Sequence, residues 1–416
     1  MDPLILTRGV HIAATIVASG TVAFMVLVAE PPWLHARLPA GFAALRVRLT
    51  LLVWIALGVA IISGAVWLVQ LAAEIFGASL VDVCLHGGAW QVASDTRFGL
   101  VWLLRVLLAV ALGMMMLMPA AKWPQLATAA LLIALIAPTG HAGATPGMAG
   151  NIHIAADMVH LVAAGCWLGA LPALVMLLIQ ARSAKAWRAY TQASVKRFSQ
   201  LGMLCVAALL ASGIINAWNL LSGPRDLIAT EYGRLMLLKV GLFTAMVAIA
   251  TVNKFHLTPR LPAGGPLRVL QRNSVGEIVL GLAVMVLVGW LGTLAPSTHV
   301  HTNSAEIPDG AAFVHIHGTE AMADVTIDPG QSGTATATIR VMREDSSVFE
   351  ARVVALALDP PGAASTSEAR TASRMADGTW QVGDIALQPS GIWTVRVIVA
   401  PPRGETIVLD APIVIE

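Results

Sequence analysis

The chain has 416 residues, of which only 12% are charged, and its mean hydropathy is +0.75. This length would allow two or three soluble domains, but such an apolar composition indicates a membrane protein whose main surroundings are the lipid bilayer. A formal net charge of +2, with no basic tract beyond the loops between apolar segments, argues against a nucleic-acid partner. Three widely spaced cysteines without a CxxC pair argue against a disulfide framework.

Eight apolar runs approach or exceed the length that spans a bilayer. They cover residues 9–29, 49–73, 98–118, 124–139, 152–180, 200–221, 235–254 and 276–295. The fourth is short and begins at Trp123-Pro124. The first lacks the short apolar core and cleavage site of a secretory signal, so we expect it to be retained. The sequence therefore predicts an all-α polytopic membrane bundle of about eight transmembrane helices in residues 1–296.

Basic residues are concentrated in alternate loops of this predicted bundle. Most of the loop Lys and Arg residues lie in residues 30–48, 119–123, 181–199 and 255–275. The intervening loops 74–97, 140–151 and 222–234 hold only Arg97, Arg225 and Arg234. By the positive-inside rule the basic loops are cytoplasmic, and an even number of helices then places both termini outside.

Residues of metal-ligand type gather near the predicted outer surface. His153, Asp157 and His160 occupy positions i, i+4 and i+7 at the start of the fifth apolar run, so a helix places them on one face. His141 lies in the loop before this run, and His11 lies near the outer end of the first run. Imidazoles and carboxylates near hydrocarbon need a partner, water or a bound ion. These five residues are therefore a candidate metal site at the outer mouth of the bundle.

Two alternatives remain open for these residues. In one, His153 and His160 bond to neighbouring helices, and Asp157 caps a helix or pairs with a basic residue. In the other, histidines on facing helices hold a haem b in an electron-transfer protein. This haem would be non-covalent, since the sequence has no CxxCH attachment motif.

Methionines near the inner helix ends would suit Cu(I), although methionine in apolar helices usually fills packing gaps.

Three charged residues fall inside the predicted helices, namely Arg105, Lys239 and Glu277. These charges could pair in the interior of the bundle. Lys239 and Glu277 could instead extend toward opposite interfaces, whereas Arg105 is the least able to reach water.

The composition changes near the C-terminus. Residues 297–310 are polar and predict a linker, and residues 311–416 contain short alternating runs rich in β-formers, separated by Gly, Pro, Asp and Ser. This pattern predicts a small all-β immunoglobulin-like sandwich. His315 and His317 lie two residues apart on a predicted strand and so point the same way, and with Met322 they form a second candidate metal site. An edge strand with two solvated histidines would give the same pattern.

Several segments resemble the CopD family of copper-resistance and copper-uptake membrane proteins. The main ones are HIAADMVHLVAAGCWLGALPAL, RFSQLGMLCVAALLASGIINAW, EYGRLMLLKVGLFTAMVAIATVNKF and VGEIVLGLAVMVLVGWLGTLAP. The segment RGVHIAATIVASGTVAF resembles the family less specifically. In the tail, FVHIHGTEAMADVTIDPGQSG resembles a YtkA-like or FixH-like domain that is appended to some CopD proteins.

The resemblance implies copper transport or handling in a bacterial inner membrane, with copper as Cu(I) or Cu(II) and without enzymatic activity unless haem is bound. We expect copper to move from the periplasmic face toward the cytoplasm through the His/Asp site. Because no CopC-type β-domain precedes the first helix, a separate periplasmic carrier of the CopC type, or the tail, is expected to deliver copper. A further possibility is that the bundle chiefly anchors a periplasmic copper-binding module. Without a GxxxxGK[ST] loop, transport would be passive or ion-coupled.

Overall fold

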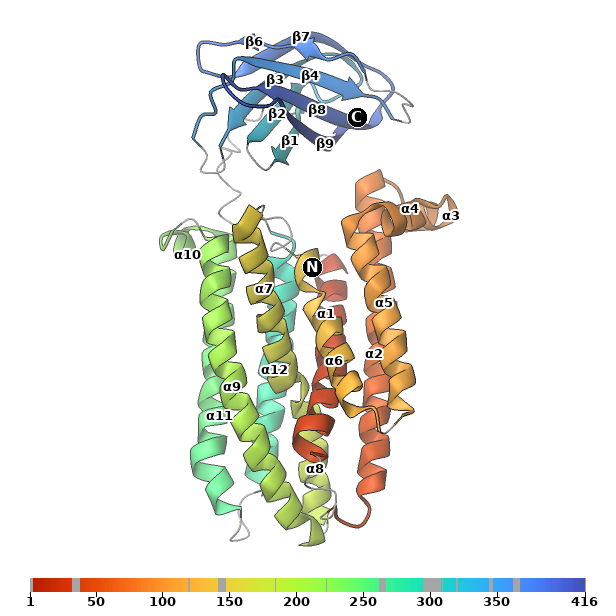
Figure 1. The fold of residues 1–416 in the computed structure, drawn as a ribbon, viewed down its shortest axis with the longest axis vertical. Coiled ribbons are helices and arrows are strands. Elements are labelled where there is room, and N and C mark those ends of the chain that lie inside the picture. The colour runs from red at the N-terminus through yellow and green to blue at the C-terminus, as the bar shows by residue number, and fades with distance from the viewer. Residues whose placement is uncertain are drawn as a thin grey trace. The chain divides into compact units, whose positions relative to one another are not determined.

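The structure is a computed structural model. It describes residues 3–31, 38–118, 120–140, 147–183, 185–221, 223–261, 267–294, 308, 310–318, 321–343, 347–361 and 367–415. The chain divides into a helical unit, Met1–Thr298, and a β unit, His299–Glu416 (Figure 1). Much of the predicted linker lies outside the described residues, so the domain limits 1–296, 297–310 and 311–416 remain our proposal.

The helical unit is a bundle of long helices that run nearly side by side (Figure 1). Its α-helices are α1 (Pro3–Ala23), α2 (Phe42–Phe76), α3 (Leu80–Leu85), α4 (Gly88–Asp95), α5 (Arg97–Met116), α6 (Lys122–Ala134), α7 (Gly147–Ala164), α8 (Leu171–Ser183), α9 (Arg188–Leu220), α10 (Asp226–Ala229), α11 (Glu231–Val252) and α12 (Leu267–Leu291). Its π-helical turns are η1 (Phe24–Ala29), η5 (Gly165–Gly169) and η7 (Asn253–Leu257). Its 3₁₀ turns are η3 (Ala137–Thr139), η6 (Lys185–Trp187) and η8 (Thr258–Arg260).

Seven helices in the described residues are long and apolar enough to cross a membrane, which confirms the predicted polytopic bundle. They cover Pro3–Ala29, Phe42–Phe76, Arg97–Met116, Gly150–Arg182, Arg188–Leu220, Glu231–Arg260 and Leu267–Leu291. The fourth predicted run instead forms α6, which has 13 residues. Pro138 lies in the short turn η3 that follows α6, and proline disfavours helical backbone at the residue before it, so the α-helix ends early.

The start of the first long helix and the end of the last one lie together. The guanidinium of Arg8, near the start of α1, donates a hydrogen bond to the carbonyl of Gly292, which directly follows α12. The first and last helices of the unit therefore have these ends on the same side of the bundle. This is the arrangement that an even number of crossings gives.

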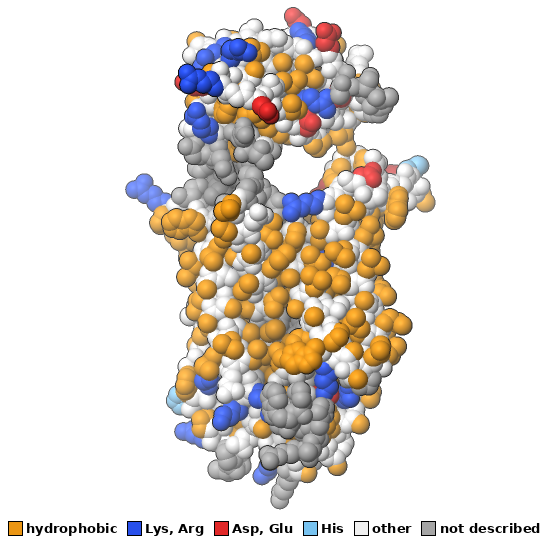
Figure 2. All heavy atoms as spheres, viewed as in Figure 1, with side chains coloured by type: hydrophobic (Ala, Val, Ile, Leu, Met, Phe, Trp, Pro, Cys, Tyr) orange, Lys and Arg blue, Asp and Glu red, His pale blue; other side chains and the backbone are white. Residues whose placement is uncertain are grey.

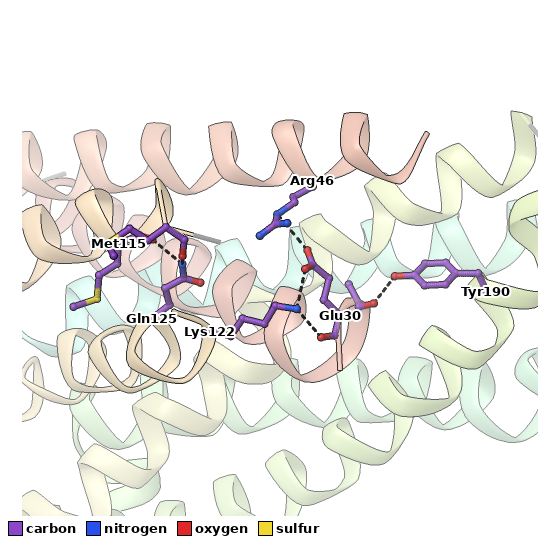
Figure 3. Close-up of polar contacts among 8 residues, drawn as sticks. Glu30, Arg46, Met115, Lys122, Gln125 and Tyr190 are labelled. Carbon is purple, nitrogen blue, oxygen red and sulfur yellow. Dashed lines mark hydrogen bonds and ion pairs between the residues drawn. The ribbon is translucent and has the colours of Figure 1, made fainter. Parts of the chain in front are cut away.

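Residues of three predicted basic loops, 30–48, 119–123 and 181–199, meet at the opposite end of the bundle around Glu30, and Figure 3 shows Arg46 and Lys122 among them. Glu30 directly follows η1 and is only 3% exposed. Its carboxylate pairs with Lys122 at 3.1 Å and with Arg46 at 3.5 Å. The Tyr190 hydroxyl and the Arg197 guanidinium donate hydrogen bonds, of 2.6 and 2.8 Å, to carbonyls in the last turn of η1. The end of the first helix is thus bonded to α2, α6 and α9.

The sides of the helical unit present hydrophobic side chains, while Lys and Arg lie mainly toward its ends (Figure 2). Exposed Leu107, Leu204 and Ile214 are among the large apolar residues that face outward. In water such surfaces would be costly, so their distribution fits a lipid-facing bundle.

Close helix contact at the centre depends on glycine. A Cβ atom built on Gly20 of α1 would lie 2.2 Å from the carbonyl carbon of Gly169 in η5. One built on Gly169 would lie 2.0 Å from the carbonyl oxygen of Ile16. The backbones of α1 and η5 therefore touch, as small residues allow between transmembrane helices.

The β unit is an all-antiparallel sandwich of two sheets, which confirms the predicted fold class. Its strands are β1 (Ala312–His317), β2 (Met322–Asp328), β3 (Gly333–Met342), β4 (Val353–Asp359), β5 (Arg370–Thr371), β6 (Ser373–Arg374), β7 (Trp380–Leu387), β8 (Gly391–Ala400) and β9 (Ile407–Ile415). One sheet has the order β1-β2-β3-β7-β6 and the other β5-β4-β8-β9. Buried Val, Ile and Leu residues, with Trp380 and Trp393, fill the space between them.

We predict that Gly20→Ala lowers the thermal stability of the purified protein, because the added methyl group meets backbone that cannot rotate away. Overpacking of this kind costs about 1–3 kcal/mol. Gly58→Ala in α2 is the matched control, since a Cβ atom there has no neighbour within 4 Å. Thermal unfolding in detergent measures both variants, and equal melting temperatures would contradict the close contact.

Candidate functional site

Helix α7 carries the predicted histidines and carboxylate, and it packs along α9. His153 is buried, with 2% of its surface exposed, whereas Asp157 and His160 are half-buried. The Asn216 amide of α9 donates a hydrogen bond of 3.1 Å to Asp157. His160 Nδ1 lies 3.0 Å from the hydroxyl of Ser212, also on α9. The polar face of α7 is therefore partnered by a polar face of α9.

The hydrogen bonds determine which nitrogen of His160 carries the proton. The Ser212 hydroxyl donates its one proton to the carbonyl of Ala208 at 2.6 Å. Its oxygen is then an acceptor for His160, so Nδ1 of the imidazole is the donor. In the neutral ring this leaves the lone pair on Nε2, which is the atom that can bind a metal.

Lys239 of α11 adds a positive charge to this region. It acts electrostatically on both Asp157 and His160. The Asn216 amide donates to the Asp157 carboxylate, and Lys239 lies close enough to act on this carboxylate, although these two described side chains form no ion pair. We call Asp157, His160, Ser212, Asn216 and Lys239 the α7–α9 polar cluster.

The sequence of α9 explains how the cluster assembles. Ser212 and Asn216 are four residues apart and so lie on one face of the helix. Gly213, beside them, lies against the imidazole, and a Cβ atom built there would be in ordinary van der Waals contact with Cε1 of His160 at 3.7 Å. These two polar residues were not among the predicted site residues. A serine and an asparagine at helical spacing in an apolar run are the signal that could have revealed them.

His11 lies in a different part of the bundle, against α2. Its Nδ1 donates to the carbonyl of Ala60 at 2.8 Å and lies 3.3 Å from the Ser63 hydroxyl. Its ring meets Trp67 edge-on at 5.7 Å between centroids. His11 is 4% exposed, and its Nε2 is buried without a hydrogen-bond partner among the described residues. No hydrogen bond or ring contact joins it to the polar cluster within the described part of the chain.

Arg105 of α5 lies near His11 and acts on it electrostatically. Its guanidinium is buried and donates to the Leu132 carbonyl and the Thr15 hydroxyl, each at 3.4 Å. Arg105 thus bonds to uncharged groups within the bundle, and among the described residues it forms no ion pair with Glu277 or another acidic residue. A fixed positive charge here disfavours a cation at His11. Lys239 has the same effect on His160, but there the carboxylate of Asp157 adds an opposite charge on the same face of α7.

The structure therefore separates the predicted site residues of the bundle. Among the described residues, no three His, Cys, Asp or Glu side chains form a group that could hold a metal ion. His141 lies outside the described residues. The contact of His160 is that of the alternative in which this side chain bonds to a neighbouring helix, whereas Asp157 accepts a hydrogen bond from the uncharged Asn216. A metal site that includes His141 or His153 stays a prediction.

The β unit places its candidate ligands on one strand pair. His315 Nδ1 is hydrogen-bonded to the carboxylate of Asp324, its cross-strand neighbour. The register sets His317 opposite Met322, and Met322 opposite Met342 of β3. Opposed residues of antiparallel strands share a face, so these positions form a His-Met-Met row across the sheet.

Within this row, Met322 is buried and Met342 is half-buried. The side chain of His317 lies outside the described part of the structure. Met342 was not predicted as a site residue, because only strand register reveals its neighbours.

Comparison with known proteins identifies relatives for most of the helical unit. Residues 192–291 match the family described as copper resistance protein D, and residues 1–151 match the N-terminal domain of copper resistance protein D-like proteins. The inner membrane protein YebZ of Escherichia coli K12 is 35% identical over 216 residues, which cover 50% of this chain and 72% of YebZ.

Two further relatives have names that refer to copper. Copper resistance protein D of Pseudomonas syringae pv. tomato is 29% identical over 231 residues, which cover 50% of this chain and 72% of the relative. Copper transport protein CutJ of Bacillus subtilis is 25% identical over 338 residues, which cover 75% of this chain and 59% of CutJ. No solved structure matches the chain.

We predict that Asp157 and Lys239 stabilise each other. Asp157→Asn and Lys239→Met should each lower the melting temperature, because each leaves one charge without its opposite in a half-buried position. The double variant should lose less stability than the two single variants lose together, with a coupling energy of about 0.5–3 kcal/mol. Lys254→Met combined with Asp157→Asn is the control and should be additive. Additive behaviour of the first pair would show that the two charges do not interact.

Proposed function

Since the chain belongs to the CopD family of copper resistance proteins, we propose that it is an inner-membrane protein that takes copper from the periplasmic face toward the cytoplasm. Two named relatives, copper resistance protein D and copper transport protein CutJ, support copper as the cargo. The name of YebZ, an inner membrane protein, supports the location. The comparisons give no support to haem.

The positive-inside rule supports the orientation that we propose. The loops that supply Arg46, Lys122 and Arg197 meet at one end of the bundle, around Glu30. That end would face the cytoplasm. The start of α1 and the end of α12 lie at the other end, so both termini of the helical unit would be periplasmic.

The observation that carries the proposal is the arrangement on α7 of His153, Asp157 and His160 along one face, in the first half of the apolar span Gly150–Arg182. The Ser212 contact directs Nδ1 of His160 away from metal binding and leaves Nε2 for copper. Hydrogen-bonded partners of this kind orient metal-binding imidazoles and raise metal affinity. In our proposal His141, in the segment before α7, completes the capture site.

His11 has a secondary place in this proposal. Its Nδ1 is held by Ala60 and its Nε2 is free among the described residues, so it retains one nitrogen for a metal. The charge of Arg105 weakens cation binding there. We therefore assign first capture to the α7 residues, and His11 to a separate, weaker station.

A second candidate function concerns the tail. The His-Met-Met row of His317, Met322 and Met342 offers the imidazole and thioether ligands that copper accepts. His315, oriented by Asp324, would present Nε2 from the same face. In this version the β unit binds copper in the periplasm, either by itself or after transfer from a separate carrier of the CopC type, and the bundle anchors it.

We predict that His153→Ala combined with His160→Ala lowers the copper affinity of the purified protein by about tenfold or more, since even an orienting partner is worth 10–100-fold. Copper accumulation by cells that express the variant should fall in parallel. The matched control is His86→Ala with His256→Ala, because both of these histidines are exposed. If affinity and accumulation both stay at the level of the unchanged protein, the α7 site is wrong.

We further predict that His317→Ala with Met322→Leu removes copper from the tail without changing the sites of the bundle. Metal analysis of the full chain should then show a loss in copper bound per protein, while accumulation by cells tests transport separately. Met375→Leu, at an exposed methionine of the same unit, is the control. Unchanged copper content would leave the tail without a metal role.

A further inference from the structure

A cavity of about 280 Å³ lies between η5, α8, α9, α11, η7 and α12, and α11 contributes only uncharged residues to its wall. Apolar side chains such as Trp167, Leu174 and Phe198 form most of its wall. It extends along α9 to Leu210, which is within one helical turn of Ser212 in the α7–α9 polar cluster. Exposed Met203 and Phe255 border it on the outer surface of the bundle. Because most of this wall is apolar, the few polar groups in it are candidates for a functional role.

The main polar group is Glu277 of α12, which is 2% exposed. The Asn253 amide donates a hydrogen bond of 2.8 Å to Oε1 of Glu277. Asn273 in turn donates to the amide oxygen of Asn253 at 2.8 Å, which orients it. Ser274, three residues before Glu277 and so on the same face, lines the cavity with a buried hydroxyl that has no partner in the described residues.

Asn253 is the first residue of the π-helical turn η7. A π-turn changes the direction of side chains within a helix and is frequent at functional sites. The turn thus places an amide from the end of α11 against a carboxyl of α12.

Glu277 has no cationic partner in the described residues. No Lys or Arg nitrogen forms an ion pair with its carboxyl there, and Lys254, the other ionisable residue of the cavity wall, has its amino group 5.6 Å from the ring centre of Phe255. The elements η5, α8 and α9 contribute no ionisable residue to the wall. The guanidinium of Arg182, in α8, donates a hydrogen bond to the side chain of Gln271, near the start of α12.

The other buried glutamate of the bundle has the opposite environment. Glu30 is held by Lys122 and Arg46, so its negative charge is compensated. A lone carboxylate in apolar surroundings is costly and takes up a proton instead. Ionisable residues in such positions commonly mark proton or ion pathways in membrane proteins.

We propose that Glu277 is a proton-exchange site that couples copper movement to the proton gradient, a role that rests on the transport function proposed above. One proton adds to the carboxylate and neutralises it, and the same proton leaves when the site opens to water. The bond from Asn253 holds Oε1 in both states, so the proton resides on Oε2. The unpartnered Ser274 hydroxyl provides a hydrogen-bonding group beside it.

Protonation of Glu277 is tested directly with dicyclohexylcarbodiimide, an apolar reagent that adds to protonated carboxyls. We expect mass spectrometry of the full chain to find the adduct on Glu277, with a yield that falls as pH rises and vanishes in Glu277→Gln. Glu30 is the internal control and should stay unmodified, because its charge is compensated. An absence of adduct on Glu277 at low pH, or a yield independent of pH, overturns the proposal.

Coupling is tested by copper flux into proteoliposomes with and without a pH gradient. The unchanged protein should be stimulated by the gradient, Glu277→Gln should bind copper but lose the stimulation, and Glu277→Asp should restore it. Gel filtration confirms that each variant is folded. A Glu277→Gln protein that still responds to the gradient overturns the proposal. If the unchanged protein moves no copper, the transport function fails, whereas the carbodiimide result still decides whether Glu277 exchanges protons.

Discussion

Hydrocarbon offers no partner to a charged or hydrogen-bonding group, so every polar side chain within a transmembrane bundle must be satisfied by the protein or by what it carries. This constraint organises the helical unit. Glu30 at one end is compensated by two cations, and Arg105 is held by a carbonyl and a hydroxyl. Asp157 is bonded by Asn216 and lies under the influence of Lys239. The polar groups that remain incompletely satisfied are the ones to which function is most reasonably assigned.

Three such groups differ in the ion that their surroundings favour. On α7, His160 has one nitrogen fixed by Ser212 and the other left with its lone pair, which suits a soft or borderline cation. His11 has a similar free nitrogen, but Arg105 opposes a positive ion there. Glu277 is bonded by the Asn253 amide and shares its face of α12 with the Ser274 hydroxyl, so a proton suits it better than copper. Copper capture and proton exchange would thus occupy different positions in one bundle.

The arrangement of α9 links these positions. Its outer portion supplies Ser212 and Asn216 to the polar cluster, and its middle portion forms a wall of the cavity that contains Glu277. A shift of α9 against α7 would change both environments together. The backbones of α1 and η5 meanwhile touch at Gly20 and Gly169, which leaves little room for movement between these two segments.

The sequence by itself determined that the protein belongs in a membrane and that it ends in a β-sandwich. It also determined the number of long apolar helices, apart from the short α6, and the alternation of basic loops between them. These properties follow from hydropathy, loop charge and strand periodicity, which are local. Helical spacing also put His153, Asp157 and His160 on one face. Only the tertiary structure decided which helix that face meets, that His11 faces α2 instead, and that Glu277 meets Asn253. Those pairings depend on helix rotation and packing between segments distant in the chain, and no local pattern in one sequence encodes them.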